Sequence, residues 1–334
     1  MKRVYIRDYN LYIPRTVVSY KELARATGLP PFVVKDKQGI VRKPIERKLS
    51  TSEMCIASMK PLVRRNEQET ERAKFLIYAG SDFKDHYIWT IAPKIGWESL
   101  HKKVLAFDIS SQCVGSLVGL DVAKSKLMAF DNGRASGFVT LSTKQSMIVN
   151  LKEPSLAFFD DFSDGAVSIL LSNESGKYEV LQSSFISDGS LSEIVWAPFG
   201  ERHLRNRGRW NYQIVLNERG NWREQMEKDS GENFKTVIRD SLRESGYGLK
   251  DVSYLAILHM KRSFHLRILR ELGIDEDKSV YLEQYGHMQG VDPFLSLMLA
   301  EKRGMIKEGD VVVLVSSGTG WVWGATTMIA GKVS

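Results

Sequence analysis

The sequence has few cysteines and no uninterrupted apolar segment of membrane-spanning character. Two cysteines among 334 residues cannot form a disulfide framework, so we expect a reducing compartment and a cytoplasmic protein. No secretory signal is expected, because Arg7 and Asp8 interrupt the N-terminal apolar residues. The uncharged stretch 311–331 is broken by the small residues 316–320 and has two tryptophans near its centre. It therefore predicts two buried strands joined by a turn instead of a membrane span.

Acidic residues are outnumbered by basic ones, 40 against 47, which gives a net charge of +7 and a pI near 9.2. Part of this excess of basic residues lies in the segment GERHLRNRGRW. The segment is either a solvated loop or a site for phosphate or an acidic partner. No nucleic-acid module is recognised, and aromatic residues do not alternate with the basic ones. We therefore expect no nucleic-acid partner.

Apolar runs and amphipathic stretches alternate along the chain, which indicates an α/β protein with buried sheets. The expected strands are 75–79, 104–109, 157–159, 166–171, 255–258 and 311–315, and the expected helices include 51–64, 232–244 and 293–303. Polar segments near 172–177 and 187–192 separate two halves with a similar pattern. We predict an N-terminal half over 1–172 and a C-terminal half over 173–334.

Cys113 follows the predicted strand 104–109 and begins a helical pattern, so it is expected in the first helical turn. There the helix dipole and unpaired N–H groups lower the pKa of a cysteine from about 8.5 and favour a nucleophilic thiolate. The alternative is a buried structural cysteine. Cys55, within a predicted helix, is interpreted as an apolar helix-face residue.

Three later features join this candidate nucleophile. His259 ends the predicted strand 255–258, His287 lies in a loop with glycines on both sides, and 317–321 predicts a turn with exposed N–H groups. A histidine after a strand is more often a packed or capping residue, so the interpretation depends on all the features together.

Six segments in order give a resemblance that spans the chain. They are GIVRKPI, AFDISSQCVGSL, FFDDFSDGAVSILL, LHMKRSFHLRIL, YGHMQGVDP and GDVVVLVSSGTGWVWGA. Together they resemble the thiolase-like superfamily and, within it, the ketoacyl synthase III type enzymes. The resemblance implies a thiolase-like fold of two related halves in a five-layered αβαβα arrangement, and a homodimer.

The resemblance also implies a catalytic triad, with Cys113 as nucleophile, His259 as the first base-like residue and His287 where ketoacyl synthase III enzymes have asparagine. The elongating ketoacyl synthases use a Cys–His–His triad. The backbone N–H groups of Cys113 and Thr319 would form the oxyanion hole. No metal and no permanently bound cofactor are implied.

Substrate recognition departs from the family pattern at two places. Arg262 stands in place of the asparagine of "PHQAN", and Phe32 or Val33 falls near the tryptophan that stacks on coenzyme A. An acidic acyl carrier protein, or the phosphates of coenzyme A, would be attracted by a group of basic residues. This group comprises Arg202, Arg205, Arg207, Lys261, Arg262 and Arg267.

Three functions remain open. The first is a condensing enzyme that transfers an acyl group from a coenzyme A or carrier-protein thioester to Cys113 and then performs a decarboxylative Claisen condensation with a malonyl thioester. The second is an acyltransferase that passes the Cys113-bound acyl group to an oxygen or nitrogen nucleophile, with His259 as base. The third is a non-catalytic subunit of a heterodimeric synthase, which the retention of Cys113 and His259 disfavours.

Overall fold

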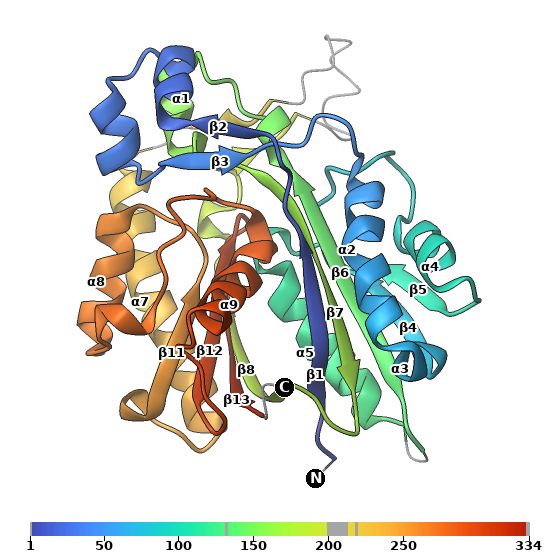
Figure 1. The fold of residues 1–334 in the computed structure, drawn as a ribbon. Coiled ribbons are helices and arrows are strands. Elements are labelled where there is room, and N and C mark those ends of the chain that lie inside the picture. Colours follow the sequence, from blue (N-terminus) through green and yellow to red (C-terminus); the bar gives the residue numbers. More distant parts are fainter. Residues whose placement is uncertain (1, 131–132, 199–212, 218–219, 332–334) are drawn as a thin grey trace.

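The structure is a computed structural model that describes residues 2–130, 133–198, 213–217 and 220–331 (Figure 1). Of the predicted basic residues, Arg202, Arg205 and Arg207 lie outside this described part. Within it, no helix is long and apolar enough to cross a membrane.

Nine strands form one hydrogen-bonded sheet, in the order β11-β12-β13-β8-β1-β7-β6-β4-β5. Their bounds are β1 Tyr5–Tyr12, β4 Ala73–Tyr78, β5 Leu105–Asp108, β6 Ser136–Lys144, β7 Asp164–Ser172, β8 Tyr178–Ser187, β11 Val252–Ile257, β12 Val311–Gly318 and β13 Val322–Ala330. Two small two-stranded sheets, β2 (Val17–Ser19) with β3 (Arg42–Pro44) and β9 (Val195–Trp196) with β10 (Val215–Leu216), lie outside it.

The large sheet contains the same strand arrangement twice. In the first half β4 and β6 are parallel, and β6, β7 and β1 follow as antiparallel neighbours. In the second half β11 and β12 are parallel, and β12, β13 and β8 follow as antiparallel neighbours. A short antiparallel pairing of β1 with β8 joins them. The two related halves predicted from the sequence are present, while the boundary between residues 172 and 173 stays a prediction.

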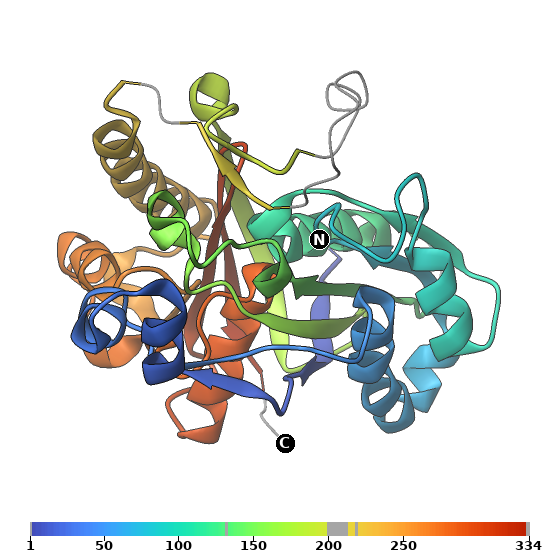
Figure 2. The same ribbon diagram turned by 90° about the horizontal axis from the view of Figure 1, so that it is seen from above.

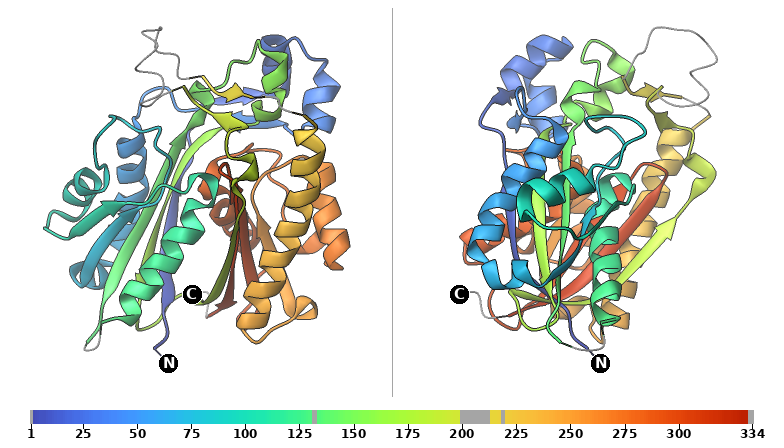
Figure 3. Two further views of the ribbon diagram at one scale, coloured as in Figure 1. Left: turned by 180° about the vertical axis from the view of Figure 1, so that it is seen from behind. Right: turned by 90° about the vertical axis from the view of Figure 1, so that its right-hand side faces the viewer.

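The helices form three layers around the two half-sheets (Figures 1 to 3). The central pair, α5 and α9, lies between the half-sheets, α2 to α4 cover the outer face of the first half, and α7 and α8 cover that of the second. Their bounds are α1 Tyr20–Thr27, α2 Thr51–Arg65, α3 Glu67–Glu71, α4 Ala92–Leu100, α5 Gly115–Met128, α7 Trp222–Glu244, α8 Arg262–Leu272 and α9 Asp292–Lys302.

Short helical turns complete the description: η1 Val33–Lys37, η2 Gln112–Val114, η3 Gln145–Met147, η4 Pro154–Phe159, η5 Gly189–Leu191, η6 Leu249–Asp251, η7 Glu276–Lys278 and η8 Gln289–Val291. The predicted strand 157–159 is wrong, because this segment belongs to the 3₁₀ helix η4. Pro154 starts that turn and the Glu153 side chain accepts from the Ser155 N–H, so a helical turn is favoured over an extended chain.

Strand alternation explains why both faces of each half-sheet are buried. Val312 and Leu314 of β12 point into the central core with α5 and α9, whereas Val313 and Val315 point to the outer core with α7 and α8. Successive side chains of a strand face opposite sides of a sheet, and all four side chains are fully buried. The five αβαβα layers expected from the sequence are therefore confirmed, and α5 begins in the middle of the molecule.

Candidate active site

The nucleophile candidate lies in a tight turn at the start of the central helix α5. Cys113 belongs to the 3₁₀ turn η2, which leads directly into α5, as the sequence predicted to within one turn. Gln112 before it has a φ of 50°, a conformation that costs energy for a residue with a side chain. A Cβ on Gly115 would come within 2.0 Å of the Ala79 carbonyl oxygen, so only glycine lets the helix begin this close to β4.

His287 contacts the nucleophile directly. Its Nε2 lies 3.2 Å from the Cys113 Sγ, and its Nδ1 lies 2.6 Å from Oδ2 of Asp292. A carboxylate can only accept, so Nδ1 carries the proton and Nε2 faces the sulfur. Burial opposes protonation of His287, but the charges of Cys113 and Asp292 and their hydrogen bonds raise its pKa well above the ordinary value. The imidazole is therefore set to hold a proton beside the Cys113 sulfur.

His259 lies beside this relay and is held by other groups. Its Nδ1 is 2.9 Å from Oδ2 of Asp161, and its Nε2 is 3.5 Å from the Gly39 carbonyl oxygen. Its main-chain N–H donates to Oδ2 of Asp292 over 2.8 Å, and the Tyr281 ring packs on its imidazole with centroids 5.2 Å apart. Asp292 therefore accepts hydrogen bonds from both predicted histidines, and it is His287 that contacts the Cys113 sulfur.

A short segment after η4 connects the two histidines. The Asp161 carbonyl oxygen accepts from the His287 N–H over 2.9 Å, and the Ser163 N–H donates to the His287 carbonyl oxygen over 2.9 Å. Oδ2 of the same Asp161 is the partner of His259. Burial tends to raise the pKa of Asp161, but the hydrogen bond and charge of His259 outweigh it and the pKa is lowered. Asp161 is thus a carboxylate with contacts to both imidazole residues.

The turn between β12 and β13 lies over the nucleophile. Ser316 Oγ donates to the Cys113 carbonyl oxygen over 2.6 Å. A Cβ on Gly318 would come 3.0 Å from the Cys113 nitrogen and 3.1 Å from the Ser111 oxygen. Thr319 is the next residue in this turn. Its predicted role in the oxyanion hole stays a prediction, and the residues of this turn that lie against Cys113 are Ser316 and Gly318.

The second half of the chain repeats the nucleophile turn without the nucleophile. Gln289 has a φ of 52°, close to the 50° of Gln112, and it begins η8 just before the central helix α9. The residue that follows it is Gly290, where the first half has Cys113. A Cβ on Gly290 would come 3.0 Å from the Ser116 nitrogen. The two turns therefore pack against each other at the start of the two central helices.

The described members of the basic group lie on or next to α8. Lys261 is exposed at the N-cap of this helix. Arg262 stacks on Tyr281, 4.5 Å from the ring centroid, and pairs with Glu283. Arg267 pairs with Glu227 over 2.9 Å. Part of their positive charge is therefore balanced within the chain, and their role in phosphate or carrier-protein binding stays a prediction.

Asp161, Asp292 and Ser316 were not among the site residues predicted from the sequence. Asp292 stands within the quoted segment YGHMQGVDP, five residues after His287, and Asp161 within FFDDFSDGAVSILL. An acidic residue just before Pro293 at a helix start was an available signal, because carboxylates are favoured there. Among the described residues, no group of three or more histidine, cysteine or acidic side chains is arranged to hold a metal ion.

Comparisons with known proteins identify the family of the chain. Family models described as 3-oxoacyl-[acyl-carrier-protein] synthase III match residues 107–189 and, for its C-terminal part, 242–329, together about half of the chain. A beta-ketoacyl-[acyl-carrier-protein] synthase III of Aquifex aeolicus is 25% identical over 95% of this chain and 96% of its own length.

Two solved structures have the same fold. A 3-oxoacyl-(acyl carrier protein) synthase III of Pseudomonas aeruginosa superposes with a TM-score of 0.86 at 18% identity, over 99% of each chain. ChlB3, described as an acyltransferase, superposes with a TM-score of 0.82 at 17% identity, over 98% of each chain. With the two family models on the segments that carry Cys113, His259 and His287, the chain belongs to the 3-oxoacyl-[acyl-carrier-protein] synthase III family.

Proposed function

We propose that this protein is a condensing enzyme of the ketoacyl synthase III type. In the first half-reaction the Cys113 thiolate attacks an acyl thioester, the acyl group forms a new thioester with Sγ, and the donor leaves as a free thiol. The observation that carries the proposal is the 3.2 Å contact between Cys113 Sγ and His287 Nε2 at the start of a buried helix. His287 takes the thiol proton and returns it to the leaving thiol.

In the second half-reaction a malonyl thioester loses its carboxylate as CO₂. The enolate that remains attacks the acyl carbon, the bond to Sγ breaks, and a 3-oxoacyl thioester leaves. Imidazole N–H groups of His259 and His287 donate to the enolate oxygen while charge develops on it, and losing one such donor typically costs about 2.7–4 kcal/mol of transition-state stabilisation. The Nδ1–H of each ring is already directed at a carboxylate, so the proton donated to the enolate oxygen is one on Nε2, which only the doubly protonated ring carries there.

The test supplies the purified chain with an acyl thioester and then with a malonyl thioester. We expect one acyl adduct by intact mass, followed by CO₂ release coupled to a product two carbons longer. Cys113→Ala should form neither the adduct nor the product. Acyl loading without CO₂ release or elongation, with malonyl groups offered on coenzyme A and on carrier protein, would contradict condensation.

Acyl transfer to an oxygen or nitrogen nucleophile is the second candidate, and one observation favours it. Asp292, His287 and Cys113 form a continuous relay, with 2.6 Å and 3.2 Å between partners, and carboxylate-backed imidazoles of this kind move protons. An asparagine at position 287 would donate a hydrogen bond but could not accept a proton. Started from pre-acylated enzyme, His287→Asn should therefore retain part of the condensation and lose transfer to an alcohol or amine by roughly 10²–10⁴-fold.

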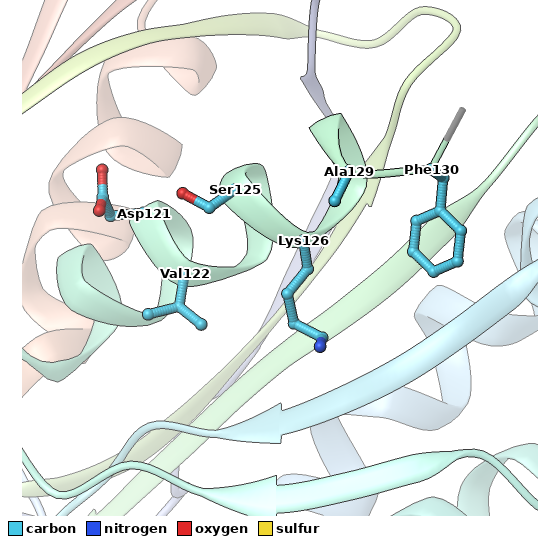
Figure 4. Close-up of a pocket in the computed structure, with 6 residues that line it drawn as sticks. All are labelled: Asp121, Val122, Ser125, Lys126, Ala129 and Phe130. Atoms are coloured by element: carbon cyan, nitrogen blue, oxygen red, sulfur yellow. The ribbon is translucent and has the colours of Figure 1, made fainter.

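We further propose that two copies pair through β5. This strand is an edge strand of the large sheet. Leu105 on β5 and Trp97 on α4 are 55% and 61% exposed. A depression of about 450 Å³ on the outer face of α5, lined by Val122 and Phe130 among others, adds apolar surface near this edge (Figure 4). Open edges with apolar side chains favour pairing. Light scattering should give the dimer mass, and Leu105→Lys should shift it toward the monomer.

The proposed partners are an acyl carrier protein or coenzyme A thioesters as acyl donor, and a malonyl thioester as extender. The exposed Lys261 and the net charge of +7 support an acidic partner, since complementary charge speeds association. No permanent cofactor enters the scheme. Both cysteines are free thiols, which is consistent with our proposal of a cytoplasmic location. Loading rates with carrier-protein and coenzyme A donors, at low and high salt, separate the two donor classes.

A further inference from the structure

A buried lysine lies behind the two histidines. Lys43, on β3, is 3% exposed. Its Nζ donates to the carbonyl oxygens of Asp160 and Phe162, at 2.6 Å and 2.9 Å. Burial lowers the pKa of Lys43, and the neighbouring charges of Asp161, Asp160 and Asp164 oppose this. An ammonium group taken out of water is tolerated only when paired and hydrogen-bonded, so Lys43 and these carboxylates depend on each other.

The two carbonyls that Lys43 holds are those on either side of Asp161. The main chain of Asp161 is thereby fixed at both neighbouring peptide groups. This residue meets both imidazole residues: its Oδ2 faces Nδ1 of His259 at 2.9 Å, and its carbonyl oxygen accepts from the His287 N–H at 2.9 Å. A shift of the segment 160–162 would therefore move both imidazoles. A change in the Asp161 side chain alone would act on His259.

We propose that Lys43 and Asp161 form a positioning unit for the two imidazoles, and that condensation depends on it more strongly than acyl loading does. This inference rests on the proposed function. His287 keeps a second support in Asp292 and its contact with Cys113, so loading survives loss of the Asp161 carboxylate. The carboxylate that faces the His259 ring is that of Asp161, and without it Nδ1 is free to lose its proton and the ring to turn.

The experiment times the two half-reactions separately in the full-length protein. Loading is followed by intact mass after an acyl thioester is added, and condensation starts from pre-acylated enzyme and a malonyl thioester. The variants are Asp161→Asn, Lys43→Met and Lys43→Arg. The matched control is Lys102→Met, because Lys102 also donates to two main-chain carbonyls, of Thr70 and Glu71 at 2.5 Å and 2.7 Å, on the outer side of the first half.

We expect Asp161→Asn to load within about threefold of the parent and to condense roughly 10²-fold more slowly or worse, the lower range for losing a positioned proton donor. Lys43→Met should also slow condensation, and Lys43→Arg should restore much of it, since a guanidinium can donate to both carbonyls. Lys102→Met should leave both steps unchanged. Condensation within threefold of the parent in both Asp161→Asn and Lys43→Met, or loading that falls as much as condensation in Asp161→Asn, overturns the proposal.

A second measurement distinguishes this proposal from the proposed function. Imidazole ¹⁵N spectra of the parent should show His259 protonated at Nδ1, and Asp161→Asn should change that signal while His287 changes less. A parent that loads but never condenses overturns the proposed function, and the positioning unit is then judged by these spectra alone. A His259 signal that is the same in parent and Asp161→Asn overturns the positioning unit, whatever the parent catalyses.

Discussion

Asp292→Asn tests the relay behind the nucleophile with a change of a single atom. The Asp292 side chain is fully buried and accepts three hydrogen bonds. Its Oδ2 accepts from His287 Nδ1 at 2.6 Å and from the His259 N–H at 2.8 Å, and its Oδ1 accepts from the Met288 N–H at 2.7 Å. All three partners are donors, which is the environment of an ionised carboxylate.

An asparagine has one acceptor oxygen and one NH₂ group, so at least one partner N–H must face another donor. The better orientation keeps the oxygen toward the two histidines and leaves the Met288 N–H unpaired. An unpaired buried N–H costs about 1–3 kcal/mol, and exchanging a hydrogen bond to a charged group for a neutral one costs about 1 kcal/mol more. We expect the free energy of unfolding to fall by about 2–4 kcal/mol.

The effect on chemistry follows from the pKa of His287. Burial lowers it, but the charges of Cys113 and Asp292 raise it well above the ordinary value. Without the Asp292 charge the pKa falls, so the imidazole loses its proton at lower pH and is a weaker base for the thiol. Acyl loading should slow by roughly 10²–10⁴-fold, as for loss of a general base.

The assay combines single-turnover acyl loading with alkylation of Cys113 by iodoacetamide between pH 5 and 9.5. In Asp292→Asn the alkaline limb of the alkylation profile, where His287 deprotonates, should move to lower pH. Asp85→Asn is the control, since Asp85 also accepts three hydrogen bonds, from Ser50 Oγ, Ser52 Oγ and the Ser52 N–H. Loading within threefold of the parent, together with an unmoved alkaline limb, would refute the relay.

Three further outcomes are expected. Intact mass should show one acyl adduct, absent in Cys113→Ser, because burial raises the pKa of Cys55 to about 12; an adduct on Cys55 would contradict the assignment. Gly318→Ala should slow loading at least tenfold, because its Cβ would press on the Cys113 nitrogen at 3.0 Å. The control Gly189→Ala, which has open space around the added Cβ, should load at the rate of the parent. Equal loading rates in the two variants would count against a role of the β12–β13 turn. Burial raises the pKa of Asp160 to about 6. Ionisation of this buried carboxyl therefore lowers the stability of the protein as the pH rises from about 4 to 6. The unfolding temperature of Asp160→Asn, measured relative to that of the parent, should accordingly be higher at pH 7.5 than at pH 4.5. A difference between the two proteins that does not change with pH would refute that linkage.

The structure also refines what the histidines are expected to do. The resemblance placed His259 and His287 in a triad with Cys113, without saying which of them contacts the sulfur. The 3.2 Å contact supports our proposal that His287 acts in the loading step, and we propose that His259, held by Asp161, is a donor in condensation. Resemblance named the two positions, but which imidazole meets the sulfur depends on how the loop before α9 folds over η2.

Local sequence determined the elements and the position of the nucleophile. Continuous apolar runs predicted the buried strands, and an apolar strand followed by a helical pattern placed Cys113 at a helix start, because these signals depend on neighbours along the chain. The predicted strand 157–159 failed for a local reason, since Pro154 and the Glu153 cap favour a 3₁₀ turn. The strands β1, β6 and β8 were not predicted, because polar residues interrupt their apolar ones.

Only the tertiary structure decided which carboxylates serve the site. Three aspartates lie within five residues of one another, and the sequence does not rank them. Asp160 accepts from Gln38, Asp161 meets His259, and Asp164 accepts from the Ser146 hydroxyl. A turn of the backbone sends neighbouring side chains in different directions, and their partners come from positions about 20 to 120 residues away. Sequence therefore gives the inventory of charged groups near the nucleophile, whereas long-range packing of the two halves decides which carboxylate meets which imidazole.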